Sequence, residues 1–233
     1  MFGYYYGFDW TYIVLVLPCI VLAMWAQHNV NTTFHKYESV YSRRRITGAQ
    51  AASMVLRQNG VSGVRIEETS GRLTDHYDPR GNVIRLSSSV YNSTSVASIG
   101  VACHEAGHAV QYAKGYAPIQ IRAAIIPLTN LGSALSMPLL ILGLIFNFQN
   151  LALIGIALFG MSTLFQLITL PVEIDASKRA LASIQQGGLL YDDEYPMARK
   201  TLTAAALTYV AALAVSLAQL LRLVILFGGR RDD

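Results

Sequence analysis

Charged residues are scarce in this sequence. Asp, Glu, Lys and Arg make up 14% of the 233 residues, whereas a soluble domain carries about 25%. The chain therefore lacks the ionic surface to face water on all sides, which excludes a disordered chain and an ordinary cytosolic enzyme. Its two cysteines are too few for a disulfide framework, so we expect both to be reduced. The hydrophobic content of 53% predicts a membrane protein instead.

Charge is absent from three long stretches. No Asp, Glu, Lys or Arg occurs at 10–27, 123–172 or 201–221. A membrane-spanning helix needs about 20 apolar residues, so the middle stretch has room for two spans, and the amides of residues 147–150 indicate a turn between them. The first span is expected to be an uncleaved anchor, because no small-residue cleavage site follows it. The expected transmembrane helices lie near 10–28, 123–146, 151–171 and 201–225.

The remaining charge indicates how the chain is oriented. Residues 28–122 contain 11 Lys and Arg against 6 Asp and Glu, while the segment before the first span and the 147–150 turn contain no basic residue. Because basic loops stay on the cytoplasmic side, residues 28–122 and 173–200 are predicted to be cytoplasmic. There is no Arg-rich stripe with interleaved aromatic residues, so nucleic acid is not an expected partner.

The 28–122 segment has a mixed helix and strand pattern. Thr47 is a predicted N-cap for a helix that stops at Gly60. Strand-like runs at 64–67 and 83–87, the second following a turn around Pro79, predict a small antiparallel sheet. A further helix is expected from 93–95 to about Lys114. Its apolar residues lie on every side, which predicts that it is buried.

That buried helix carries the sequence His104-Glu105-Ala106-Gly107-His108. Residues four apart lie on one face of a helix, so the two imidazoles can bind one Zn²⁺, with Glu105 beside them to reach a metal-activated water. Burying these three side chains together without a metal would be costly. The motif therefore predicts a zinc hydrolase site, in preference to two histidines that only hydrogen-bond to their neighbours.

A zinc ion held by two histidines needs a third protein ligand. After two membrane crossings the chain returns to the same side at Pro171, and Glu173 is the first charged residue there. An acid at a membrane boundary is expected to have a partner, and zinc would be a good one. We therefore expect Glu173 to be the third ligand. Asp175 is the rival, and further possible ligands are His28, His35 and His76.

The sequence resembles a known family at three places, which are residues 73–80, the 104–108 motif and residues 171–177. It looks like the YugP family of bacterial membrane zinc metallopeptidases, and more distantly like the HtpX and Ste24 membrane proteases of the gluzincin type. The resemblance covers essentially the whole chain. It implies that the zinc ligands are His104, His108 and Glu173, and it places Ser177 where those proteases have an aspartate that orients a zinc-bound histidine. Ser177 and Asp175 are therefore candidates for supporting the metal ligands.

The expected activity is peptide-bond hydrolysis, in which zinc activates a water and Glu105 is the general base. The expected substrate is a protein or peptide that adds as an extra strand to the edge of the sheet, with 83–87 as the candidate edge strand. His76 or Tyr77 could donate a hydrogen bond in the transition state, although a hydrogen-bonded turn before Pro79 also explains them. The alternatives are a non-catalytic membrane scaffold or chaperone-like protein with a structural metal site and, less well supported, a transporter. The oligomeric state is not predicted.

The expected fold class is a membrane α+β protein, with about four transmembrane helices and a small mixed α/β zincin-like domain that carries the HExxH helix. It is expected in the bacterial cell membrane as a multi-pass protein. The expected organisation is an N-terminal anchor at 1–28, the zincin-like domain at 29–122, a transmembrane hairpin at 123–171, a loop or helix with the third ligand at 172–200, and a C-terminal transmembrane helix and tail at 201–233.

Overall fold

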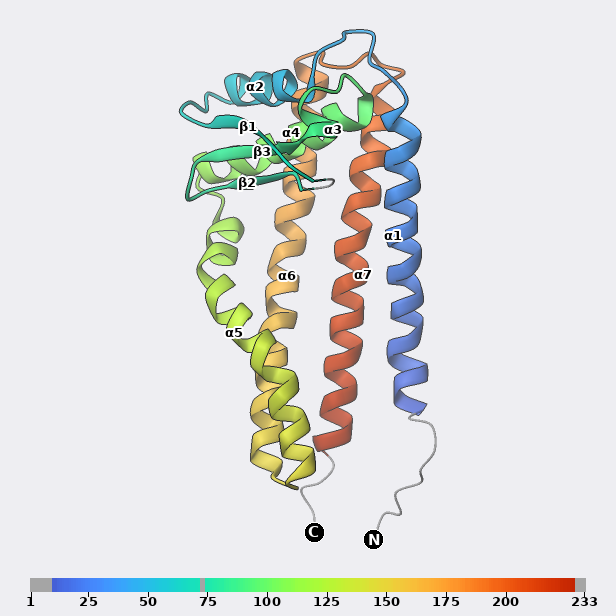
Figure 1. Ribbon diagram of the computed structural model, residues 1–233, viewed down its shortest axis with the longest axis vertical. Coiled ribbons are helices and arrows are strands. Elements are labelled where there is room, and N and C mark those ends of the chain that lie inside the picture. Colours follow the sequence, from blue (N-terminus) through green and yellow to red (C-terminus); the bar gives the residue numbers. More distant parts are fainter. Residues whose placement is uncertain (1–9, 72–73, 229–233) are drawn as a thin grey trace. The chain divides into compact units, whose positions relative to one another are not determined.

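The computed structural model describes residues 10–71 and 74–228, so the outer ends of the two expected terminal segments lie outside the described residues. The protein is mostly helical, with one small sheet (Figure 1). In chain order its elements are η1 (Tyr12–Val16), α1 (Leu17–Glu38), α2 (Gly48–Gln58), β1 (Arg65–Thr69), β2 (His76–Asp78), β3 (Val83–Ser87), α3 (Ser88–Tyr91), α4 (Val96–Ala113), α5 (Ala117–Ile145), α6 (Gln149–Gln186) and α7 (Tyr195–Gly228).

Four helical segments among the described residues are long and apolar enough to cross a membrane, which confirms the number of long apolar helices expected from the charge pattern. They are Tyr12–Glu38, Ala117–Ile145, Gln149–Gln186 and Tyr195–Phe227. They are longer than the expected spans. Helix α6 continues through Pro171, which lies inside it, and ends just before Gly187 and Gly188. The positive φ of 57° at Gly188 suits a helix terminus.

The described chain divides into two compact units. The first unit consists of residues 10–25, 125–167 and 210–228, and the second of residues 26–71, 74–124 and 168–209. In the first unit α5 and α6 come close together at small residues, because a Cβ on Gly155 would lie 2.8 Å from the Ser136 carbonyl oxygen. Such contacts are typical of helices that pack within a bilayer.

The sheet of the second unit has the strand order β1-β3-β2. Strand β3 pairs with β1 in parallel and with β2 in the antiparallel direction, so Ile84 lies opposite both Ile66 and Tyr77. The expectation of an antiparallel sheet is therefore wrong for β1, and β3 is the central strand rather than an edge strand. Its nearly continuous burial explains this position, since both of its edges are paired and most of its side chains belong to the core.

Helix α4 lies in the core of the second unit and packs against α2, α3 and the strands β2 and β3. Its N-cap is Ser95, whose hydroxyl accepts a hydrogen bond from the backbone N–H of Ser98. Helix α2 begins with the predicted Thr47 cap, which forms a capping box with Gln50. The core around α4 holds this helix in a fixed position.

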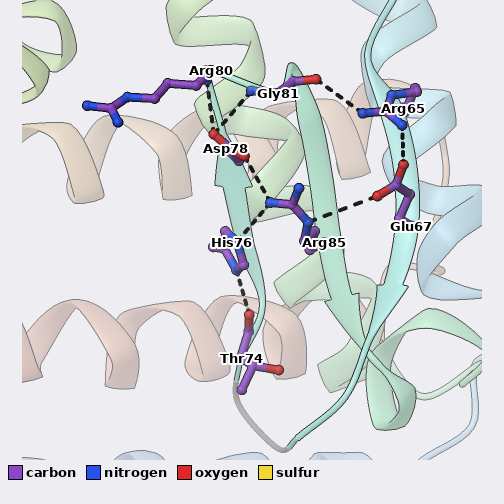
Figure 2. A network of polar contacts seen from close by, with 8 residues as sticks. All are labelled: Arg65, Glu67, Thr74, His76, Asp78, Arg80, Gly81 and Arg85. Carbon is purple, nitrogen blue, oxygen red and sulfur yellow. Dashed lines mark hydrogen bonds and ion pairs between the residues drawn. The ribbon is translucent and has the colours of Figure 1, made fainter.

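A network of polar side chains ties the edge strand β2 to the two other strands (Figure 2). Arg85 of β3 donates to Asp78 of β2 at 2.9 Å and lies 4.0 Å from Glu67 of β1. Asp78 also accepts the backbone N–H groups of Arg80 and Gly81, which closes the turn between β2 and β3. The network fixes the short strand β2 in register.

Candidate active site

Helices α4 and α6 bring three potential metal ligands together in the second unit. His104 and His108 lie one helical turn apart on α4, with their ring centroids separated by 4.7 Å. Glu173 of α6 faces both rings, and its Oε2 lies 3.2 Å from His104 Nε2 and 3.5 Å from His108 Nε2. The ligand atoms of the three side chains all lie within 4.8 Å of one another, the only such group among the residues that the structure describes.

The spacing of these atoms fits a tetrahedral zinc site. Ligands about 2.0–2.1 Å from a tetrahedral zinc ion are about 3.3 Å from one another. The separations of 3.2 and 3.5 Å between the glutamate oxygen and the two ring nitrogens are close to this value. Two imidazoles and one carboxylate also form the ligand set of a catalytic zinc site, which leaves a fourth position for water.

The two helices come together at Gly107, between the two histidines. A Cβ on Gly107 would lie 2.7 Å from the carbonyl oxygen of Ala176 on α6. These are backbone atoms of the neighbouring helix, so they cannot rotate away from a larger side chain. Only glycine therefore permits the approach that places Glu173 opposite the two histidines.

Replacing Gly107 by Ala is predicted to destabilise the protein by about 1–3 kcal/mol, the usual cost of overpacking, and to weaken zinc binding because α6 must move away from α4. Gly100→Ala is the matched control on the same buried helix, since its Cβ would lie an ordinary 3.6 Å from the Ala198 side chain. Thermal unfolding and zinc titration of both purified variants test this prediction. Equal stability and equal zinc affinity of the two variants would contradict it.

The far ring nitrogens of both histidines are held by polar side chains. His104 Nδ1 lies 3.1 Å from the Ser177 hydroxyl, which is one turn beyond Glu173 on α6. His108 Nδ1 lies 2.9 Å from Gln111 Oε1. Gln111 in turn donates through Nε2 to the Val172 carbonyl at 2.8 Å and to Asp175 Oδ2 at 2.9 Å.

These contacts determine which nitrogen of His108 carries hydrogen. The Val172 carbonyl and the ionised Asp175 carboxylate can only accept hydrogen bonds. Gln111 must therefore direct its amide nitrogen toward them and its amide oxygen toward the imidazole. His108 Nδ1 therefore donates, and in the neutral ring Nε2 carries the lone pair. That lone pair faces Glu173 Oε2 at 3.5 Å, so two acceptors meet and require a cation between them, either a proton or a metal ion.

The pKa of His108 reflects this arrangement. Burial alone would lower the pKa of the imidazole, but the hydrogen bond and charge of Glu173, the charge of Glu105 and the contact with Gln111 together raise it above the ordinary value. The surroundings of His108 therefore favour positive charge. A bound metal cation would satisfy the same demand.

Sequence reasoning missed three residues near the ligands, namely Gln111, Arg122 and Tyr209. Arg122 donates to Glu173 Oε1 at 3.2 Å, so this residue binds one carboxylate oxygen while the other faces the histidines. The sequence contains a signal for this pair, since Arg122 and Glu173 are the charged residues on either side of the 50-residue uncharged stretch. Gln111 follows His108 by three positions on one helix face. Tyr209, whose side chain interacts with Glu173, lies in an apolar run that gave no signal.

A cavity of about 260 Å³ opens beside the ligands. It exposes His104 and Glu173 together with Glu105, whose side chain is largely buried but makes no hydrogen bond or ion pair with any described residue. A carboxylate without such partners is free to accept a proton from a molecule in the cavity. The remaining lining residues are Gln27, Val30, Asp75, Val101, Ser177, Leu202, Ala205, Ala206, Thr208 and Tyr209.

The other residues singled out from the sequence lie elsewhere. His76 Nδ1 donates to the Thr74 carbonyl at 2.7 Å, and its Nε2 lies 3.5 Å from Arg85 (Figure 2). Tyr77 donates to Asn82 at 2.9 Å. Neither belongs to the residues that line the cavity. Asp175 is held by Gln111 and Arg179 and supports His108 indirectly. His28 and His35 do not join the group of potential ligands within the described chain.

Comparison with known proteins agrees with this chemistry. Residues 12–228 match the family described as "Putative neutral zinc metallopeptidase". The chain is also 43% identical over 222 residues to the "Putative membrane protease YugP" of Bacillus subtilis (strain 168), covering 95% of this chain and 99% of that protein. No solved structure matches it.

Proposed function

Because the chain belongs to the family described as "Putative neutral zinc metallopeptidase", we propose that it is a membrane-embedded zinc metallopeptidase. His104, His108 and Glu173 would hold the zinc ion. The observation that carries this proposal is the approach of two acceptors, His108 Nε2 and Glu173 Oε2, at a separation that suits a shared metal ion. When bound, zinc supplies Lewis acidity that acidifies a water molecule and polarises the scissile carbonyl.

Glu105 would be the general base. Its carboxylate faces the cavity next to the ligands and is not held by other described side chains. It takes the proton of the attacking water and then gives that proton to the leaving amine, so that the peptide bond breaks into a free carboxylate and a free amine. Ser177 and Gln111 hold the two imidazoles so that each Nε2 faces Glu173.

The open side of β2 is the proposed docking edge for an extended peptide. Strand β3 is paired on both sides, so β1 and β2 are the edge strands. Of these two, β2 is directly preceded by a residue that lines the cavity, Asp75. A substrate strand beside β2 would satisfy the unpaired backbone groups of that edge and run toward the ligands. The substrate class is therefore an unfolded or extended segment of a protein or peptide.

Hydrolysis of casein by the purified full-length protein tests the proposed activity. A metal chelator is expected to abolish hydrolysis, because without zinc nothing acidifies the attacking water or polarises the scissile carbonyl. Stoichiometric zinc should restore the activity after the chelator is removed. Hydrolysis that persists in full after the bound zinc has been stripped would contradict the proposal.

The four apolar helices are proposed to cross the bacterial cell membrane, with the active site on the cytoplasmic side. In a background with Cys19 and Cys103 replaced, a membrane-impermeant thiol reagent should label a cysteine at Asn150 in intact cells. Cysteines at Arg80 and Gln186 should be labelled only after permeabilisation. All three positions are exposed, so failure to react reports the side of the membrane. Labelling of the Arg80 position in intact cells would reverse the orientation.

A further inference from the structure

The cavity beside the potential zinc ligands contains one carboxylate that the proposed mechanism does not use. Among the residues that the structure describes, its lining includes three acidic side chains, which are Glu105, Glu173 and Asp75, and no lysine or arginine. Glu173 faces the histidines, and Glu105 is the proposed base. Asp75 is left without a role in the hydrolysis itself.

Asp75 is held firmly in place. Its Oδ1 accepts the backbone N–H of Ser87 at 2.8 Å, and the Ser87 hydroxyl lies 3.1 Å from both carboxylate oxygens. Ser87 is fully buried at the end of β3, so these contacts attach the residue before β2 to the centre of the sheet. The carboxylate is therefore fixed at the end of the edge strand, where it forms part of the cavity wall.

No basic side chain of the described residues forms an ion pair with Asp75. Burial raises the pKa of its carboxyl group, even though the hydrogen bonds from Ser87 act in the opposite direction. Apart from the attraction of His76, the described residues offer this partly desolvated carboxylate no counter-ion, so its charge is costly to maintain. A cation that enters the cavity would remove that cost.

We propose that Asp75 binds a cationic group of the substrate and thereby makes the cavity selective for peptides that carry an ammonium or guanidinium group near the scissile bond. The inference rests on the proposed peptidase function. The apolar side chains of Val30, Val101 and Leu202 in the cavity wall suit the aliphatic stem of a lysine or arginine. The cation can come from such a side chain or from the free amino terminus of a short peptide.

Two sets of fluorogenic peptides test the proposal with the zinc-loaded full-length protein. In the first set, lysine is compared with norleucine, its uncharged analogue, at each position around the scissile bond. In the second set, the amino terminus is free or acetylated. Because a hydrogen bond to a charged group is worth about 10-fold to 100-fold in binding, the wild type should favour the cationic member by that factor, mainly through KM.

The variant Asp75→Asn should remove this preference, since its amide oxygen can still accept from Ser87 but carries no charge to bind the cation. Asp192→Asn is the control, because Asp192 is an exposed aspartate that does not line the cavity. A preference that acetylation alone abolishes identifies the amino terminus as the cation. A preference that only norleucine abolishes identifies a basic side chain.

Equal kcat/KM of the wild type for cationic and neutral peptides in both sets would overturn the proposal, and this comparison needs no variant to fold. A preference for cationic peptides that survives in Asp75→Asn would also overturn the proposal. Peptide binding to Glu105→Gln, measured by fluorescence anisotropy with and without Asp75→Asn, gives a readout that requires no hydrolysis. If the wild type cleaves no peptide but Glu105→Gln still binds the cationic ones through Asp75, the proposed function fails and the cation site stands.

Discussion

Replacing Glu105 by Gln is expected to reduce peptide hydrolysis by at least about 100-fold, the lower end of what a general base contributes, while zinc stays bound. The amide has the shape of the carboxylate but cannot take a proton from water. Zinc binding should persist because Glu105 is not one of the three side chains whose ligand atoms converge. Zinc content and casein hydrolysis of the same purified sample measure both effects.

The matched control for this prediction is Glu68→Gln, the same change at an exposed position of β1 outside the cavity. It should keep both zinc and activity. Full activity of Glu105→Gln would sink the peptidase mechanism even with zinc present. A wild type that binds zinc and cleaves nothing would favour the non-catalytic scaffold that the sequence left open.

The second large effect is expected at Glu173. Glu173→Gln replaces an anionic ligand by a neutral amide and also removes the charge that Arg122 contacts, so zinc affinity should fall further than in any other α6 variant. Asp175→Asn and Ser177→Ala change only side chains that support the histidines, and each should cost about 10-fold to 100-fold in metal affinity or activity. The order of the three variants in a competitive zinc titration is the prediction.

Ser183→Ala provides the control on the same helix, because Ser183 is also buried but accepts from Asn59 at 3.3 Å rather than contacting a histidine. It should bind zinc as the wild type does. Zinc retained by Glu173→Gln but lost by Asp175→Asn would show that the wrong carboxylate had been assigned. Retention by both variants would move the third ligand to another part of the chain.

The HExxH helix and its partner could be predicted because each depends on a strong local or topological constraint. The four-residue spacing of His104 and His108 fixes their common helix face. The 50-residue uncharged stretch is long enough for two spans, which predicts that the chain returns to the same side at Glu173. The same reasoning would have paired Arg122 with Glu173, since these two charges lie at the ends of that stretch and meet at 3.2 Å.

The strand order could not be predicted in this way. Local pattern indicates that 83–87 is a strand, but its partners are set by packing against α3 and α4, which are distant from β1 in sequence. The parallel pairing of β1 with β3 reverses the expected direction of one pair. The near-continuous apolar character of Val83, Ile84 and Leu86 was a signal of a central strand, and it was interpreted as an edge strand.

Side chains that support the ligands were the least accessible to sequence reasoning. Tyr209 lies in an apolar helix that shows no polar pattern around it, so only the tertiary structure reveals its contact with Glu173. The role of Gln111 depends on the Val172 carbonyl and on Asp175, both more than 60 positions away. Contacts of this kind require the close approach of α4 and α6 at Gly107, which a single sequence does not specify.

The central claim is that His104, His108 and Glu173 hold one zinc ion. X-ray absorption at the zinc edge of the purified full-length protein, loaded with one equivalent of zinc, tests it most directly. The account predicts nitrogen and oxygen neighbours only, with the outer-shell scattering of two imidazole rings that falls to one ring in His108→Ala. Sulfur neighbours, or a spectrum that is unchanged in His108→Ala, would contradict it.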